Sequence, residues 1–504
     1  MTYQKHIGIS KSLYTLFRQC PKALWLKTYK PELCVISDAL QQRLQVGSAV
    51  GDLAKGLFGK FTDVTSYDDN GNLDINKMLA DTLNSIQSGT GVICEAAFQY
   101  NGDFCAVDIL KKENSGYGIY EVKSSTDSDK DVYAQDVAFQ KYILTHCGVE
   151  VTGTYLVCIN SDYILDGELD IHSLFQVQDI SEAVAQEYPL VESQLTTARN
   201  MLASSDVEPD VDLDVHCHKP YDCAFWQYCS RYLPENSVFD LYRMNFDKKI
   251  LYYKQDIITF EQLQNEELND KQQMQIDCTL NNTIYINKVE IAKFLSTLSY
   301  PLYFLDFETM QSVIPEFQGT HPYQQIPFQY SLHYIELEGG ELKHKEFLGI
   351  SGNDPRRALA EQLCRDIPMD VCVTAYNKAF ECTRLTELAD TFPDLAEHLL
   401  NIRDHIIDLL VPFQSGWYYT PAMSGSFSIK SVLPALFPNG SELDYHNLPG
   451  SVHNGGEAMN IFPKIKDMSL EEQKVARQSL LKYCELDTYA MVKVWQKLKE
   501  VGET

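Results

Sequence analysis

Acidic residues in the C-terminal third of the chain have types and spacing suited to a metal site. Asp306 and Glu308 lie at the end of a short apolar run, Leu302–Phe307, which predicts a buried strand. Alternation along a strand places both carboxylates on the same face. Two carboxylates held together resist ionisation unless a cation lies between them. Taken alone, the pair is equally typical of a solvated strand end.

Two further positions extend this pattern. Residues 371–375 predict a strand, and Phe380 begins a helix whose first turn carries Glu381. On its own, Glu381 could simply complement the positive end of that helix. Tyr483 and Asp487 lie four residues apart on a predicted terminal helix that begins near Ser469, so both side chains share one face. On their own, they could be a core tyrosine and a solvated aspartate.

Together these residues could hydrolyse a phosphodiester. Two divalent ions bridged by carboxylates neutralise charge on the phosphoryl oxygens and supply an activated water. Asp306, Glu308, Glu381 and Asp487 would be the metal ligands, and such oxygen ligands favour Mg²⁺ or Mn²⁺. Tyr483 would orient the water, because a phenol with a pKa near about 10 is a poor base.

The order and context of these residues resemble the DnaQ-like exonucleases, in the tyrosine-bearing DEDD branch. The resemblance covers residues 298–504 and implies an RNase H-like fold with 3′→5′ exonuclease activity. Asp306 and Glu308 match the first motif, Glu381 the second, and Tyr483 with Asp487 the third. The second motif usually supplies Asp, so Glu381 departs from the pattern and metal preference could differ. The segment GSFSIKSVLPALF also resembles the Ser- and Lys-bearing helix that precedes the third motif.

A second group of charged residues lies near the N-terminus. Asn101-Gly102 predicts a hairpin between two alternating strands, and Asp108 lies near the end of the second. Glu121 and Lys123 share one face of the next strand. Carboxylates beside a lysine suit a metal-bound water next to a scissile phosphate, with Lys123 stabilising the developing charge. The alternative is a surface ion pair on an edge strand.

Four cysteines of the N-terminal region form a second pattern typical of a known family. Cys217, Cys223 and Cys229 follow at six-residue steps, and Cys20 lies in an early helix. Residues 7–232 resemble the RecB-type PD-(D/E)XK nucleases that carry a [4Fe–4S] cluster, including the CRISPR adaptation and AddB types. The resemblance implies that these cysteines bind the cluster, and that Glu95, Asp108 and Glu121 bind metal with Lys123 beside them. A Zn²⁺ site is the alternative, with His218 as a substitute ligand.

This second match has three departures. The first gap between the late cysteines is longer than usual. Gly51 stands where these nucleases often carry a metal-binding His, and Gln140 only loosely matches the usual Gln-x-x-x-Tyr.

Composition sets limits on these interpretations. A chain of 504 residues with 44% hydrophobic residues should form two or three packed domains. No signal peptide or transmembrane run is visible, so we expect a cytoplasmic protein without disulfides and without a membrane partner. The net charge of −28 opposes nucleic-acid binding and requires local basic residues, for example Lys343, Lys345, Arg356 and Arg357.

The sequence thus predicts an α/β protein in three parts. These are a PD-(D/E)XK domain at 1–235, a helical connector at 236–297 and an RNase H-like exonuclease domain at 298–504. The expected activity is metal-dependent nuclease action on single-stranded DNA ends, with RNA also open, and a role in DNA repair or anti-phage defence would fit. The alternatives are one active site with the other domain acting as a grip, and a non-catalytic metal-stapled binding module.

Overall fold

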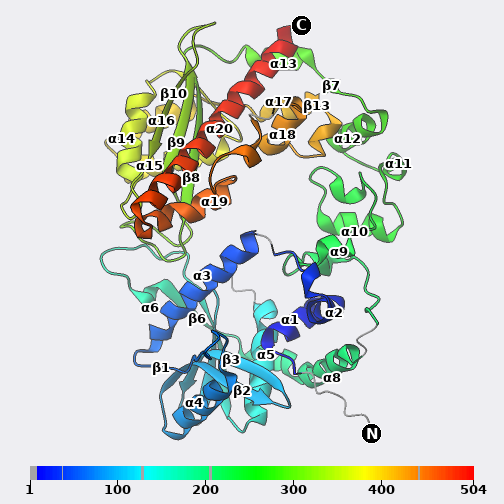
Figure 1. The fold of residues 1–504 in the computed structure, drawn as a ribbon, viewed down its shortest axis with the longest axis vertical. Coiled ribbons are helices and arrows are strands. Elements are labelled where there is room, and N and C mark those ends of the chain that lie inside the picture. Colours follow the sequence, from blue (N-terminus) through cyan, green and yellow to red (C-terminus); the bar gives the residue numbers. More distant parts are fainter. Residues whose placement is uncertain (1–7, 37, 127–129, 204–206, 441–442, 504) are drawn as a thin grey trace. The chain divides into compact units, whose positions relative to one another are not determined.

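The computed structural model describes residues 8–36, 38–126, 130–203, 207–440 and 443–503. The chain forms two compact units, each built from a mixed β-sheet and helices (Figure 1). Unit 1 comprises Met1–Tyr232 and Ser312–Gln324, and unit 2 comprises Leu233–Gln311 and Gln325–Thr504. The expected α/β class is therefore confirmed. None of the described helices is both long and apolar enough to cross a lipid bilayer.

Unit 1 contains a six-stranded sheet in the order β1-β2-β3-β4-β5-β6. Its strands are β1 Thr62–Asp63, β2 Val92–Tyr100, β3 Asp103–Lys112, β4 Tyr117–Val122, β5 Val151–Ile159 and β6 Phe175–Asp179. The β2–β3 and β3–β4 pairs are antiparallel, and β4 pairs with β5 in parallel. As predicted, Asn101 and Gly102 form the β2–β3 turn, and both have positive φ angles.

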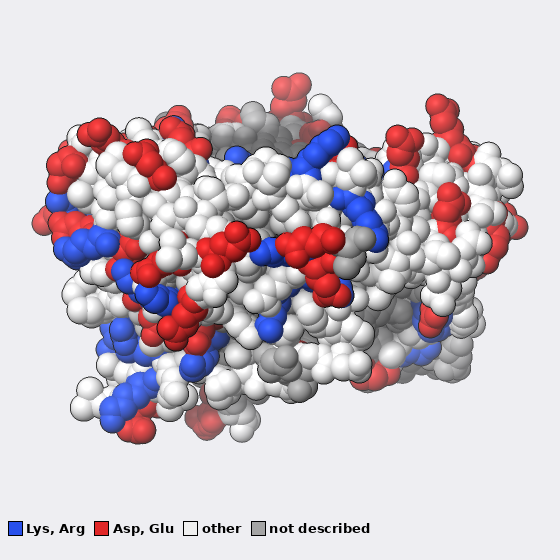
Figure 2. All heavy atoms as spheres, turned by 90° about the horizontal axis from the view of Figure 1, so that it is seen from above, with Lys and Arg blue, Asp and Glu red and all other residues white. Residues whose placement is uncertain are grey.

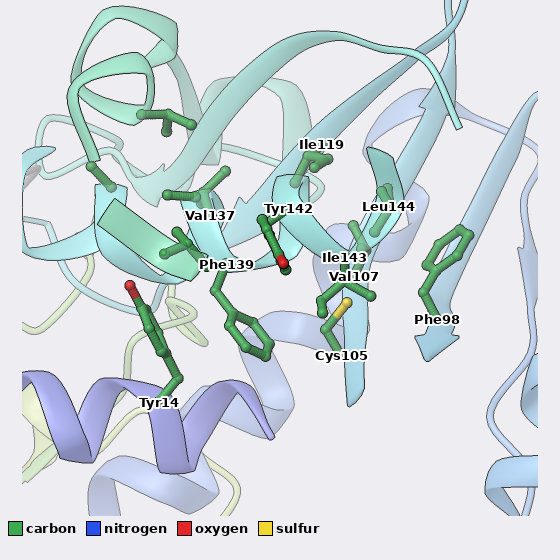
Figure 3. Close-up of a cluster of buried hydrophobic side chains, with 14 of the residues drawn as sticks. Tyr14, Phe98, Cys105, Val107, Ile119, Val137, Phe139, Tyr142, Ile143 and Leu144 are labelled. Atoms are coloured by element: carbon green, nitrogen blue, oxygen red, sulfur yellow. The ribbon is translucent and has the colours of Figure 1, made fainter. Parts of the chain in front are cut away.

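The helices of unit 1 include the long α5, which connects β4 to β5. They are α1 Lys11–Gln19, α2 Pro21–Tyr29, α3 Asp38–Ala54, α4 Ile75–Gln87, α5 Lys130–His146, α6 Ile171–Leu174, α7 Ser181–Glu187, α8 Val191–Leu202 and α9 Trp226–Cys229. Tyr14 of α1 stacks on Phe139 of α5 with ring centroids 5.0 Å apart, at one side of the buried cluster in Figure 3. This contact fixes α1, and with it Lys11, against the sheet.

Residues 312–324 separate two strands of unit 2 in the sequence but pack within unit 1. Val313 joins a core cluster with Val50 and Ile109. Leu165 N–H donates to Thr320 O at 2.9 Å, and the Tyr323 hydroxyl donates to Ser124 O. The chain therefore passes between the units at three points.

Unit 2 contains a five-stranded sheet in the order β10-β9-β8-β11-β12. Its strands are β8 Leu302–Gln311, β9 Gln325–Ile335, β10 Lys343–Leu348, β11 Cys372–Ala375 and β12 Ile406–Asp408. The β8–β9 and β9–β10 pairs are antiparallel, whereas β8–β11 and β11–β12 are parallel. A separate two-stranded ribbon pairs β7 Tyr285–Ile286 with β13 Tyr418–Tyr419.

The helices of unit 2 flank this sheet. They are α10 Phe246–Lys254, α11 Phe260–Leu263, α12 Asp270–Asn281, α13 Lys288–Leu295, α14 Arg356–Asp366, α15 Ala379–Thr391, α16 Ala396–Asp404, α17 Val411–Gln414, α18 Ile429–Leu436, α19 Gly455–Ile461 and α20 Leu470–Glu503. Residues 236–297, the expected connector, lie within unit 2 and include its helices α10 to α13. The long α20 runs alongside β8 and β9 (Figure 1).

Candidate active site

The central strand of unit 2 carries the first two carboxylates. Asp306 and Glu308 lie on β8, in register with Ser331 and Gln329 of β9. The strand is longer than the predicted run and continues to Gln311, so the pair lies within the sheet. Glu308 is only 8% exposed. Both carboxylates face the same side, as the alternation predicts.

Helix α20 covers that side of the sheet. Thr488 hydrogen-bonds the side chains of Ser331 and His333, at 2.7 and 2.8 Å. The Cys484 thiol lies 3.8 Å from Asp306 Oδ2. Ligand atoms of Asp306, Glu308 and Cys484 all lie within 4.8 Å of one another, close enough for a single ion. The helix therefore brings Tyr483 and Asp487 to the carboxylates of β8.

The fourth carboxylate comes from the helix after β11. Glu381 lies in the first turn of α15 and is 3% exposed. Its Oε2 atom is buried without a hydrogen-bond partner. Asp408 anchors the start of this helix, because its carboxylate accepts the Asn377 and Lys378 backbone N–H groups at 2.8 and 3.2 Å. Glu381 is thus a buried acceptor without a hydrogen bond, and its charge helps to raise the pKa values of Asp306 and Glu308.

Burial raises the pKa values of all four carboxyl groups, and neighbouring carboxylates raise those of Asp306, Glu308 and Glu381 further. Burial, and then Asp487, raises the pKa of Asp306 well above its usual range. The pKa of Glu308 is also raised well above its usual range, by burial and then Asp487, with Lys430 opposing. Burial raises the pKa of Glu381 to about 8 and that of Asp487 to about 6. Such a group stores electrostatic strain that a bound cation relieves.

Two side chains near Asp487, Tyr445 and Lys430, had no assigned role in the predicted site. Tyr445 donates its hydroxyl hydrogen to Asp487 Oδ1 at 2.6 Å. The Lys430 ammonium donates to the Tyr483 hydroxyl at 3.2 Å. Both Lys430 and Tyr445 line a cavity of about 720 Å³ together with His453. Lys430 lies in the recognised GSFSIKSVLPALF segment, but Tyr445 lies in a single turn of 3-10 helix, Tyr445–Asn447, and has no periodic signal in the sequence.

The N-terminal carboxylates are aligned across three strands of unit 1. Cys94 and Ala96 pair with Ile109 and Val107, so Glu95 and Asp108 occupy opposing positions. The register of β3 with β4 likewise sets Asp108 opposite Glu121. Burial, and then the charge of Asp108, raises the pKa of Glu95 to about 7. The structure thus places the three residues that the sequence predicts as metal ligands at neighbouring positions of three adjacent strands.

Glu121 is the centre of a hydrogen-bonded network. Lys123 Nζ lies 2.9 Å from its Oε1, and Gln140 Nε2 donates to its Oε2 at 2.6 Å. The Lys123 ammonium also pairs with Asp136 at 3.0 Å, a contact that no sequence pattern predicts. Although burial opposes ionisation, Lys11 and Lys123 hold the pKa of Glu121 well below its usual range. Gln140, which matched its motif only loosely, therefore does contact the site.

Lys11 is the second unpredicted member of this network. Its ammonium lies 2.9 and 3.1 Å from the two carboxylate oxygens of Glu121 and 3.9 Å from Asp108. Burial alone would lower the pKa of Lys11, but these carboxylates outweigh it and raise the pKa. A cationic group of the chain therefore lies between two of the predicted metal ligands.

The four predicted cysteines lie close together. Cys20 precedes α2, and the segment from Cys217 to Cys229 packs beside it around Phe225. The Cys223 N–H donates to Cys217 O at 2.9 Å. Burial, opposed by hydrogen bonds to backbone N–H groups and reinforced by the neighbouring thiols, raises the pKa of Cys223 to about 12. No three of these described sulfurs lie within 4.8 Å of one another. His218, the alternative ligand, contacts Asp222 at 2.6 Å.

The basic residues expected to form a nucleic-acid groove are engaged by carboxylates. Lys343 pairs with Glu336, Lys345 with Asp366, Arg356 with Asp354, and Arg357 with both Glu361 and Asp394. Figure 2 shows Lys and Arg side chains interspersed with Asp and Glu over the face that it displays. A role for these four residues in a nucleic-acid groove stays a prediction, and in the structure each of them is paired with at least one neighbouring acid.

Comparison with known proteins gives one match. A family model described as a domain of unknown function (DUF2779) matches residues 303–428, a span that includes Asp306, Glu308 and Glu381. No curated protein and no solved structure gives a significant match to the chain.

Proposed function

We propose that the protein is a metal-dependent nuclease whose unit 2 removes nucleotides from the 3′ end of single-stranded DNA or RNA. The observation that carries this proposal is the convergence of Asp306, Glu308, Glu381 and Asp487 beside Tyr483. These residues come from β8, α15 and α20, and they match the three motifs of the DnaQ-like exonucleases. Three antiparallel strands followed by two parallel ones, with the first pair of acids on the central strand, support an RNase H-like fold for this unit.

The donor set fits divalent cations of the Mg²⁺ or Mn²⁺ type. Four carboxylates supply hard oxygen ligands, and Glu381 Oε2 is a buried acceptor with no hydrogen bond of its own. Two such ions would neutralise phosphoryl charge and supply an activated water. Cys484 lies beside this set, but burial and the neighbouring carboxylates raise the pKa of its thiol well above the usual value, so it stays neutral and leaves the carboxylates as the ligands.

The remaining side chains have roles in positioning. The Tyr445 hydroxyl holds the Asp487 carboxylate by a hydrogen bond and so fixes its orientation. Tyr483 presents its hydroxyl beside Asp487, where it can orient a water by hydrogen bonding. Burial and the surrounding carboxylates raise the pKa of Tyr483 far above its usual value, so it donates a hydrogen bond and does not act as a base. Lys430 brings a positive charge near the phosphate that would be cleaved.

The polarity of degradation tests this proposal. With Mn²⁺ or Mg²⁺, a 5′-labelled oligonucleotide should give a ladder of shortened products, whereas a 3′-labelled one should release labelled mononucleotide first. EDTA should stop both. Absence of any metal-dependent shortening, on DNA and on RNA alike, would rule out the exonuclease.

A second nuclease site in unit 1 is supported by its own observation. Glu95, Asp108 and Glu121 are aligned across three strands, and Lys123 and Gln140 contact Glu121. Two antiparallel pairs followed by a parallel pair, with α5 between β4 and β5, support a PD-(D/E)XK fold. Because the Lys11 ammonium lies between Glu121 and Asp108, a divalent ion must compete with it. We therefore expect a requirement for millimolar metal.

We also propose that Cys20, Cys217, Cys223 and Cys229 bind a [4Fe–4S] cluster. Four mutually close thiols from the two ends of unit 1 form a suitable donor set. A single tetrahedral Zn²⁺ with Zn–S bonds of about 2.3 Å would need sulfurs roughly 3.8 Å apart. No trio of these described sulfurs lies within 4.8 Å of one another, so a single Zn²⁺ would require the thiols to move closer together. The cluster would tie α2 to the 217–229 segment.

A further inference from the structure

A cavity of about 540 Å³ lies beside the exonuclease site of unit 2. Two of its lining residues come shortly before residues of the proposed site on α15 and α18. Asn377 lies four residues before Glu381, and Ser428 lies two residues before Lys430. The opposite wall comes from Tyr242 and Arg243, which belong to the segment that the sequence presents as a connector.

The connector wall is held rigidly. Buried Gln275 accepts the Tyr242 N–H at 2.8 Å and donates to Asp240 O at 2.9 Å. The Tyr242 ring packs on Phe427 with centroids 4.6 Å apart. A β-carbon added at Gly425 would lie 2.7 Å from Asp240 O, so only glycine allows this close approach. Arg243 is therefore presented at a fixed place on the cavity.

The cavity has the donor set of an anion site. Arg243 is exposed and, within the described part of the chain, its guanidinium makes no ion pair. Ser426 and Ser428 contribute hydroxyl groups, and Ser428 begins α18 without using its side chain as a cap. None of the described residues that line the cavity is acidic. Three other cavities of similar size each include at least one carboxylate, so this absence stands out in a chain of net charge −28.

We propose that this cavity binds a backbone phosphate of single-stranded nucleic acid, upstream of the bond that unit 2 cleaves. The inference rests on the proposed exonuclease. Arg243 would grip the phosphate with its planar guanidinium, and Ser426 and Ser428 would donate hydrogen bonds to it. The connector then serves as part of the substrate track. Through Arg243, the connector supplies local positive charge that is not paired with an acid among the described residues, unlike the charges of Lys343, Lys345, Arg356 and Arg357.

The test compares Arg243→Gln with the wild-type full-length chain. Glutamine keeps a β-carbon and hydrogen-bonding capacity, so the positive φ of 45° at this position is no more strained than before. For an eight-residue oligothymidylate, KM should rise about tenfold, the effect of losing about one good phosphate contact. The small substrate thymidine 5′-(p-nitrophenyl phosphate), which has no upstream phosphate, should be hydrolysed within twofold of the wild-type rate. Arg357→Gln, which removes a positive charge already paired with acids, should leave both unchanged.

Salt dependence gives a second measure that a structural role would not move. In Ca²⁺ buffer, the affinity of Arg243→Gln for fluorescein-labelled oligothymidylate should depend less steeply on salt than the affinity of the wild type. Its slope of log K against log salt should fall by about 0.7 for one phosphate contact. An unchanged oligonucleotide KM and slope, or an equal loss on the small ester, would overturn the proposal. If the wild type cleaves neither substrate, the exonuclease fails, while the slope still tests the cavity.

Discussion

At the scale of single residues, the proposed exonuclease chemistry depends on how the side chains around Asp487 are held. Tyr483 is buried, hydrogen-bonded by Lys430 and adjacent to Asp487. In the proposed exonuclease its hydroxyl would orient a water and would not bind metal. Tyr445 plays the related part of orienting the Asp487 carboxylate.

Tyr483→Phe should therefore lower kcat for 3′ trimming by about 10²-fold, because it removes one aligned hydrogen bond from the reacting water. Metal affinity should change little. Single-turnover rates on a 5′-labelled oligonucleotide, with Mn²⁺ binding measured by calorimetry, check both statements. Loss of Mn²⁺ binding in this variant would make Tyr483 a structural residue.

Sequence reasoning recovers residues that lie on regular elements and misses those that do not. The carboxylates of β8 were predicted from their two-residue spacing on a strand, and Asp487 of α20 from its four-residue spacing to Tyr483 on a helix. The Asn101-Gly102 pair predicted the β2–β3 turn. Tyr445 could not be found, since it lies in a three-residue 3-10 turn and reaches Asp487 only through tertiary folding. Lys11 is far from Glu121 in sequence, and nothing in its local pattern indicates their contact.

The paired basic residues illustrate the same limit. In the sequence, nothing near Lys345 or Arg357 indicates their partners Asp366 and Asp394, which lie elsewhere in the chain. Charge counted along a sequence does not show which charges neutralise one another. Arg243, in a segment that looked like a spacer, proved to be exposed and without an ion pair among the described residues.

At the scale of elements, the carboxylates on β8, α15 and α20 couple folding to pH. Asp and Glu side chains have pKa values near about 4 in an unfolded chain, but folding raises the pKa of Asp487 to about 6 and that of Glu381 to about 8. Their protonated forms stabilise the fold at pH values below the unfolded pKa. That contribution is lost as the pH rises through the folded pKa values.

The thermal transition of metal-free unit 2 should therefore move to lower temperature between pH 5 and pH 8.5. Mn²⁺ should restore it, and by more at the higher pH, because the cation relieves the repulsion between ionised carboxylates. Scanning calorimetry of the full chain, with and without EDTA, measures both effects. Glu381→Gln should weaken the pH dependence, and a shift of the opposite sign would contradict the account.

The proposed cluster site is a second feature that joins separate elements, because its cysteines come from two distant segments of unit 1. Cys20 before α2 and the cysteines at 217–229 belong to opposite ends of unit 1. Anaerobically purified protein should be brown with iron and sulfide bound, and with broad absorbance near ~400 nm. Cys223→Ser should lose this colour and unfold unit 1 at lower temperature, while unit 2 keeps its own transition. Colourless wild type with one zinc per chain would replace the cluster with a zinc site.

At the scale of the whole molecule, two separate units should give two separable activities. The site in unit 1 has its own carboxylates and does not use Asp306. In the Asp306→Ala background, a cleavage activity should therefore persist that needs millimolar Mn²⁺. Its products should differ from 3′ trimming. Adding Lys123→Ala should abolish it.

Linear, circular and flapped substrates are all needed for that comparison. If Asp306→Ala protein cleaves none of them with either ion, unit 1 acts as a scaffold. Because the net charge of the chain is −28, we expect the intact protein to bind nucleic acid weakly and in a salt-sensitive way.

The most direct test of the central claim is the rate at which Asp306→Ala removes the 3′-terminal nucleotide of a 5′-labelled single-stranded oligonucleotide. Asp306 is the carboxylate closest to Cys484 and is grouped with Glu308 in the candidate metal site. Its loss should lower the rate by about 10³-fold or more, the effect of several kcal/mol of charge stabilisation. The protein should stay folded, since the substitution also relieves repulsion among buried acids. A folded Asp306→Ala protein that trims 3′ ends at the wild-type rate would contradict the account.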